Sequence, residues 1–219
     1  MKVTSSKFQA LIDRDSIYDS LFGYTSPATI YRVGRTCRLA YWAVKDYTGR
    51  AFDINSHLKR FFVDPFGFRV IQARTQAVVS GSSALQFFDR TVYPNSDLDI
   101  FVANKDAAEV CAWIVNCGGK GYKFVPTEKQ ALKNIITPRL ALRVHRRGEN
   151  QASYMVDEQF SNWNFYDSNR YRAVLNFKAT TGEDQTQVVQ VIVTHNTPME
   201  CILSFHSSKS ISAYDVLLF

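Results

Sequence analysis

The feature that most constrains this chain is a pair of aspartates, Asp97 and Asp99, two positions apart at the start of an apolar run. Side chains alternate between the two faces of a β-strand, so a strand here places both carboxylates on one face. The apolar residues Leu98, Ile100 and Val102 then point into a core. The two aspartates lie about 7 Å apart at their Cα atoms. Such a pair can hold a hard cation such as Mg²⁺, which favours one or two carboxylates plus substrate phosphates.

A tight turn and a short helix are predicted ahead of the aspartate pair. Val78-Val79 is strand-like, Gly81 permits a sharp turn, and Ser82 or Ser83 can cap the helix that follows. The backbone N–H groups and positive end of that helix suit a phosphate. Residues 78–102 therefore predict a strand, a Gly-Ser turn, a short helix, a loop and a second strand. A metal site beside a phosphate cradle is what nucleoside triphosphate chemistry needs.

Gly81-Ser82, followed after fourteen residues by Asp97-Leu98-Asp99, resembles the signature of the polymerase-beta-like nucleotidyltransferase superfamily. The resemblance implies that Asp97 and Asp99 are catalytic residues that ligate Mg²⁺ or Mn²⁺. It also implies that Gly81, Ser82 and Ser83 bind a nucleoside triphosphate. Enzymes of this superfamily transfer a nucleoside monophosphate to a hydroxyl of a protein, an RNA or a small molecule, using two metal ions about 4 Å apart.

A third carboxylate on a neighbouring strand completes the metal site in that superfamily, and this chain departs from the pattern there. The corresponding position is Gln190, in the strand-like run 188–193. Glutamine coordinates through its carbonyl oxygen but neither adds a negative charge nor takes a proton. Asp157, Glu183 or Asp184 could replace the acid in space. Two functions are therefore predicted: a metal-dependent nucleotidyltransferase, or a catalytically degenerate nucleotidyltransferase fold that serves as a recognition module.

Other classes of site explain less of the pattern. A glycosyltransferase metal motif of the Asp-x-Asp type accounts for the aspartates but leaves Gly81-Ser82 unexplained. In haloacid dehalogenases the Asp-x-Asp follows a strand directly, whereas Asp97 follows Tyr93-Pro94-Asn95-Ser96. The simplest structural interpretation is a capped helix followed by a strand whose acids face solvent.

Residues 1–64 are predicted to form a helical segment. Apolar residues recur at helical spacing in 7–22, Ser26-Pro27 supplies an N-cap and a first helical position, and further helices are predicted at 31–44 and 51–62. A break is expected at 64–67.

Part of this helical segment resembles a docking motif. The pattern from Ile17 to Val44, with Leu21-Phe22, Ser26-Pro27 and Trp42 within it, resembles an F-box. The resemblance implies that residues 17–44 dock on a Skp-type adaptor of a ubiquitin ligase. Plain helical packing is the alternative explanation.

Residues 65–219 are predicted to form a nucleotidyltransferase-like mixed sheet flanked by helices, so the fold class is α+β. The predicted helices are 68–75, 104–116, 127–136, 197–206 and a final one within 210–219. The predicted strands besides those at 78–79 and 97–102 are 122–125, one from residue 140, and an antiparallel hairpin of 171–179 and 187–194. The two parts in this order resemble a family of fungal proteins that join an F-box-like start to a nucleotidyltransferase-like body, for which no reaction is established.

The charge of the chain is compatible with nucleotide or nucleic-acid partners, since the net charge is +6 and the isoelectric point is near 9.1. A basic cluster follows the strand expected from residue 140, and it consists of Arg139, Arg143, His145, Arg146 and Arg147. Such a cluster is expected to contact phosphates, above all through Arg143, Arg146 and Arg147. The alternative is that its charge keeps an edge strand from pairing with another chain.

Composition sets the expected location. No apolar run approaches the roughly 18 residues of a membrane span, and the first residues lack the apolar core of a signal peptide, so no membrane partner is expected. The four cysteines show no Cys-x-x-Cys spacing. Reduced thiols of an intracellular protein, cytoplasmic or nuclear, fit better than a zinc site or a disulfide framework.

Overall fold

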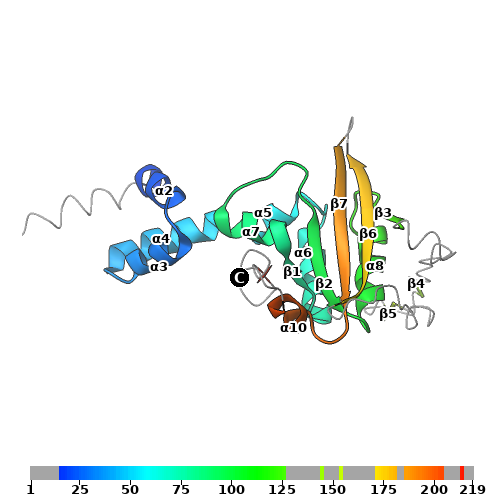
Figure 1. Ribbon diagram of the computed structural model, residues 1–219. Helices are drawn as coiled ribbons and strands as arrows, with labels where there is room; N and C mark the ends of the chain where they lie inside the picture. The colour runs from blue at the N-terminus through cyan, green and yellow to red at the C-terminus, as the bar shows by residue number, and fades with distance from the viewer. Residues whose placement is uncertain are drawn as a thin grey trace, which may run out of the picture. The chain divides into compact units, whose positions relative to one another are not determined.

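The structure of the chain is a computed structural model that describes residues 15–126, 144–145, 153–154, 171–181, 185–204 and 213–214. Figure 1 shows an α+β fold with helices at the start of the chain and a mixed sheet after them, as the sequence predicts. Contacts divide the chain into two units, Met1–Ile54 with Gln86–Val92, and Asn55–Leu85 with Tyr93–Phe219.

The helices and strands of the described residues follow in chain order. The helices are α2 (Asp15–Gly23), α3 (Pro27–Gly34), α4 (Arg38–Ala51), α5 (Ile54–Leu58), α6 (Pro65–Thr75), α7 (Gly81–Asp89), α8 (Ala107–Asn116) and α10 (Pro198–Leu203). The strands are β1 (Val78–Ser80), β2 (Leu98–Ala103), β3 (Lys123–Val125), β4 (Val144–His145), β5 (Ser153–Tyr154), β6 (Tyr171–Thr181), β7 (Gln185–Thr194) and β8 (Ala213–Tyr214). None of these helices is long and apolar enough to cross a membrane.

Helices α2, α3 and α4 of the first unit share a small apolar core. Its buried members are Tyr18, Phe22, Ile30, Ala43, Val44 and Tyr47. Ser26 caps α3 by accepting from the Thr29 backbone N–H at 3.3 Å, and Pro27 occupies the first turn, as the sequence predicts. The helix expected at 31–44 is instead divided. Gly34 ends α3, and extended Cys37 caps α4 by accepting from the Ala40 N–H at 3.5 Å.

Within the first unit, one arginine holds residues 86–92 against residues 23–52. Arg90 Nη2 donates to the carbonyl oxygens of Thr25, at 2.8 Å, and of Gly23, at 3.4 Å. The guanidinium carbon also lies 6.0 Å from the Tyr47 ring centroid and 5.5 Å from that of Phe52. Cation–π contacts of this kind contribute about 0.5–2 kcal/mol each. The end of α7 is therefore held by atoms of the first unit.

Two predicted helix boundaries in the second unit differ from the structure. The first helix is expected over 51–62. In the structure Ala51 is the last residue of α4, and of the remaining residues only Ile54–Leu58 are α-helical, as α5. The break expected at 64–67 is instead a helix start, since Asp64 accepts from the Gly67 N–H at 2.9 Å and Pro65 is the first residue of α6. Proline fits this position because the first helical N–H has no partner within the helix.

Among the described residues of the second unit, six strands form a sheet in the order β3-β6-β7-β2-β1-β8, and β4 pairs with β5 in a separate sheet. Strands β2 and β7 are parallel, and the remaining pairs are antiparallel, including the predicted β6–β7 hairpin. Residues 213–214 form strand β8, which pairs with β1, so the prediction of a helix is wrong at those positions. The reason is that one edge of β1 is not paired with β2 and is free to hydrogen-bond with β8. Predictions for 7–14, 127–136 and 140–143 lie outside the described residues.

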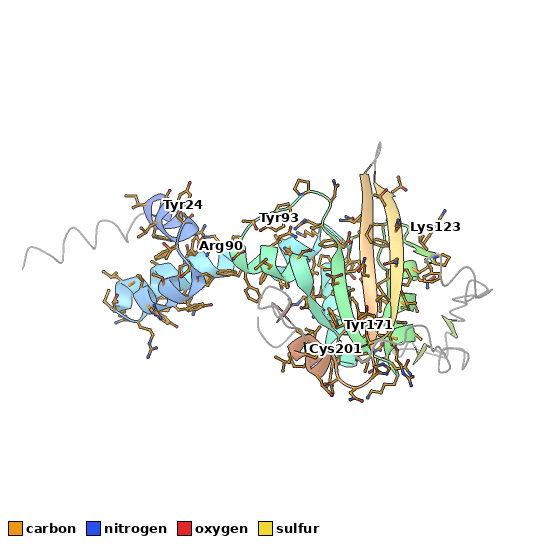
Figure 2. All side chains as sticks on the ribbon, in the orientation of Figure 1. Tyr24, Arg90, Tyr93, Lys123, Tyr171 and Cys201 are labelled. Atoms are coloured by element: carbon orange, nitrogen blue, oxygen red, sulfur yellow. The ribbon has the colours of Figure 1, made fainter. Side chains whose placement is uncertain are left out.

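The two faces of this sheet differ. The residues of one face are fully or almost fully buried, among them Leu98, Ile100, Val102, Val189, Val191 and Val193. Helix α8 contacts both β2 and β7. On the other face Phe101 and Ile192 pack with Cys201 and Ile202 of α10. Figure 2 shows Cys201 and Tyr171 together at the α10 end of the sheet, so the opposite end of this face is left for polar side chains.

Candidate metal and nucleotide site

A row of polar residues crosses four adjacent strands at the end of the sheet away from α10. Ser80 pairs with Asp99, Asp99 with Gln190, and Gln190 with Asn176. Directly paired residues share a face, so all four side chains lie on the face of Phe101. Helix α7 leaves β1 immediately after Ser80. The structure therefore brings together the Gly-Ser turn, the aspartate pair and Gln190, which the sequence predicted to lie on neighbouring strands.

The aspartate pair is held in a partly buried, electrostatically strained arrangement. Burial, and secondly the charge of Asp97, raises the pKa of Asp99 to about 6. Burial also raises the pKa of Asp97, and the positive charge of Lys178 opposes that shift. Gln190 Nε2 donates to Asp97 Oδ2 at 3.4 Å. Two neighbouring carboxylates that resist ionisation together gain stability from a bound cation.

Gly81 sits against the Asp99 carboxylate. Its φ of +74° lies in the left-handed region, which residues other than glycine disfavour. A Cβ atom at this position would overlap Asp99 Oδ2. The absence of a side chain at Gly81 therefore lets the first turn of α7 lie against the Asp99 carboxylate.

The two serines of the turn have different surroundings. Ser82 is exposed at the start of α7. Ser83 is fully buried, and its Oγ shares a hydrogen bond of 2.9 Å with His57 Nε2. Burial, and secondly the charge of Arg60, lowers the pKa of His57 to about 4, so this imidazole is neutral at pH 7. Ser83 thus faces His57 of α5.

Arg60 links the loop before the aspartate pair to two other segments. Its Nη2 donates to Ser96 Oγ at 3.0 Å and to the Tyr93 carbonyl at 3.5 Å. Its backbone carbonyl accepts from Lys120 Nζ and from Gln187 Nε2. Figure 2 shows Tyr93 on the loop that leads from α7 to β2. Arg60 therefore fixes the path of the chain into Asp97.

Strand β6 contributes two further side chains to this face. Asn176 Oδ1 is buried and accepts no hydrogen bond from any residue that the structure describes. Lys178, two positions along on the same face, is exposed. A buried amide oxygen without a donor costs about 1–3 kcal/mol. Water or a ligand group removes that cost.

The donor set fits one hard divalent cation. Asp97 and Asp99 supply two carboxylates, and the amide oxygens of Gln190 and Asn176 are neutral oxygen donors on the same face. Mg²⁺ is bound by one or two carboxylates with water and phosphate oxygens at its other positions. Within the ranges described here, no three His, Cys, Asp or Glu residues gather where they could hold a metal.

Several predicted residues lie outside the described part of the chain. These are Asp157, Glu183 and Asp184, the candidate substitutes for the third acid, and Arg139, Arg143, Arg146 and Arg147 of the basic cluster.

Four residues near the site were not predicted to belong to it: His57, Arg60, Asn176 and Lys178. No sequence spacing links Arg60 or Lys178 to Asp97, because both residues are far from it along the chain. Asn176 was within reach of sequence reasoning, because a two-residue alternation in the β6–β7 hairpin places it opposite Gln190.

Comparison with protein-family models, with curated proteins and with solved structures found no match to this chain.

A Gly81→Ala substitution is expected to lower the free energy of unfolding by more than Gly121→Ala does. Both glycines have positive φ, +74° and +71°, but nothing lies within 4 Å of a Cβ at Gly121. The positive φ alone costs about 1–2 kcal/mol, and only Gly81→Ala adds overlap with Asp99. Urea unfolding of both variants measures the difference. Equal losses would show that Gly81 does not touch the carboxylate.

The pKa of Asp99 is expected to fall in Asp97→Asn, because the neighbouring negative charge is removed while burial remains. Carboxyl ¹³C NMR titration measures both proteins. Asp106 is the control, since burial raises its pKa and the charges near it are Lys105 and Glu109. An Asp99 pKa that stays near 6 in the variant would show that Asp97 lies too far away to share a cation.

Proposed function

We propose that this protein binds a nucleoside triphosphate with one Mg²⁺ or Mn²⁺ at the face of β2 and β7, as a recognition module that does not turn the nucleotide over efficiently. One observation carries the proposal. Gln190, directly paired with Asp99, donates its amide N–H to Asp97 where a nucleotidyltransferase needs a third carboxylate.

Each part of the site has a role in binding. Asp97 and Asp99 hold the cation, and the cation neutralises charge on the phosphates. The phosphates lie at the start of α7, where Gly81 and Ser82 supply backbone N–H groups and the positive helix end. Lys178, near enough to lower the pKa of Asp97, adds a positive charge. The Ser83–His57 hydrogen bond anchors the first turn of α7 against α5.

Transfer of a nucleoside monophosphate requires more than this set supplies. An acceptor hydroxyl needs a second metal ion or a base to remove its proton. Gln190 provides neither, because an amide does not accept a proton at neutral pH. Holding one metal–nucleotide complex is therefore the activity that the described residues support.

Mn²⁺-dependent nucleotide binding is expected for the native chain and is expected to weaken by about tenfold or more in Asp97→Ala/Asp99→Ala, a loss of about 1.4 kcal/mol. Isothermal titration with each nucleoside triphosphate measures affinity and stoichiometry. One metal per chain is expected. The control is Asp106→Ala, which removes a partly buried carboxylate from the same unit at the turn before α8.

Gln190→Glu tests the missing acid directly. It restores a third carboxylate beside Asp99, so the Mn²⁺ stoichiometry is expected to rise from one to two. Incubation with labelled nucleoside triphosphates measures transfer to RNA, protein or small-molecule acceptors. Label transfer by the native chain, lost in Asp97→Ala/Asp99→Ala, would overturn the recognition module and identify a nucleotidyltransferase. No metal-dependent nucleotide binding by the native chain would overturn the site.

A second candidate function concerns the first unit, for which we propose docking on a Skp-type adaptor through residues 17–44. The supporting observation is that α2, α3 and α4 form a helical unit with its own core while Leu21 and Tyr24 remain 56% and 97% exposed. Apolar side chains left in water beside a formed core favour contact with another protein.

Co-purification of the full chain with a Skp-type adaptor is the expected result. Leu21→Ala/Tyr24→Ser is expected to abolish it, because both side chains lie outside the core of the first unit and can be removed without a cavity. Val63→Ala, at an exposed apolar residue of the second unit, is the control. Unchanged adaptor binding by the double variant would place the contact elsewhere.

A further inference from the structure

The first unit carries an unusual distribution of charge. No Asp or Glu occurs between Asp19 and Asp46, whereas Arg32, Arg35, Arg38 and Lys45 all occur there. The side chains of Arg32, Arg35 and Arg38 make no hydrogen bond or ion pair with another residue of the described ranges. Their charges are therefore not neutralised within the described unit.

Aromatic residues lie between these cations on one face of α4. Arg38, Tyr41, Trp42 and Lys45 occupy positions i, i+3, i+4 and i+7, which share a helix face. We call these four residues the α4 stripe. All four are exposed, and the side chains of Tyr41 and Trp42 are 51% and 52% accessible. The opposite face of α4 carries the buried Ala40, Ala43, Val44 and Tyr47.

Contacts within the stripe hold its two rings together. The ring centroids of Tyr41 and Trp42 are 5.3 Å apart with the planes at 76°. Lys45 Nζ lies 5.1 Å from the Trp42 ring centroid. The solvent face of a helix is ordinarily polar, so two adjacent aromatic rings there, flanked by cations and outside the buried cluster of this unit, indicate a contact surface.

We propose that the α4 stripe binds single-stranded nucleic acid. Bases stack on Trp42 and Tyr41, and Arg38 and Lys45 contact the phosphates on either side. Base–aromatic stacking stabilises such complexes by about 1–3 kcal/mol per base and requires no particular sequence. This inference is independent of the nucleotide site, since every residue in it belongs to the first unit.

Single-stranded nucleic acid fits the stripe better than an acidic protein segment does. From residue 38 to residue 45 the helix rises about 10 Å, enough for two nucleotides with a cation at each end. An acidic segment pairs with Arg38 and Lys45 but offers the rings no flat partner. A duplex keeps its bases stacked on one another, so its bases do not reach the rings.

The test is fluorescence anisotropy of the full chain with labelled oligouridine and oligothymidine of about twelve nucleotides. Trp42→Ala is expected to weaken binding roughly 10- to 100-fold, and Trp42→Phe to retain most of it because a ring remains. Arg38→Ala/Lys45→Ala is expected to lower the slope of log affinity against log salt by about 0.7 per cation, measured between about 50 and 200 mM salt.

Two matched controls make the result specific. Phe66→Ala removes an exposed aromatic residue outside the stripe, and Lys105→Ala removes an exposed cation; both residues belong to the second unit. Both are expected to bind like the native chain, and circular dichroism confirms that all variants fold. Tighter binding of oligouridine or of oligothymidine shows whether the stripe prefers RNA or DNA.

Three outcomes would overturn the proposal. These are no binding of either oligonucleotide, binding by Trp42→Ala equal to that of the native chain, and equal competition by polyglutamate, which would show a general anion surface. Loss of adaptor co-purification in Trp42→Ala without loss of oligonucleotide binding would assign the stripe to a protein partner instead.

Discussion

The parallel pairing of β2 with β7 is the interaction on which the site of this protein depends. It aligns Asp99 with Gln190 across two strands that are far apart in the chain, and the β6–β7 hairpin extends the same row to Asn176. Parallel neighbours need a long crossover between them, so the chemistry at this row is set by residues that no local motif connects. The pairing places the Gln190 amide beside the aspartate pair.

Gly81 and Arg60 help to fix the turn and the loop that lie next to the aspartate pair. Gly81, by lacking a Cβ, lets α7 begin against Asp99. The Arg60 side chain holds the loop before Asp97 by donating hydrogen bonds to Ser96 and Tyr93. The Arg60 backbone carbonyl accepts hydrogen bonds from Lys120 and Gln187. The result is a partly buried pair of carboxylates whose pKa values are raised by burial.

The surfaces that we propose for recognition differ between the two units. The sheet offers carboxylates and amides inside a partly buried face, which suits one small, metal-bound ligand. Helix α4 offers exposed rings and cations, which suit an extended polyanion. The first unit has its own apolar core, and Arg90 brings residues 86–92 to it by binding the carbonyls of Gly23 and Thr25. That attachment depends on a left-handed residue at the end of α7, where Arg90 has a φ of +55°.

The sequence by itself determined the strand–turn–helix–loop–strand of 78–102, the β6–β7 hairpin and the helix cap at Ser26, because alternation and capping are local properties. It also indicated that Gln190 lies on a strand next to the aspartate pair. Helix ends such as those at Gly34 and Cys37 were missed, since a turn that keeps the apolar spacing looks like a continuous helix. Only the tertiary structure decided that Ser83 faces His57, that Arg60 and Lys178 lie near the aspartates, and that Asn176 completes the row. Those contacts join distant segments, and their distances depend on sheet register and packing, which periodicity does not encode.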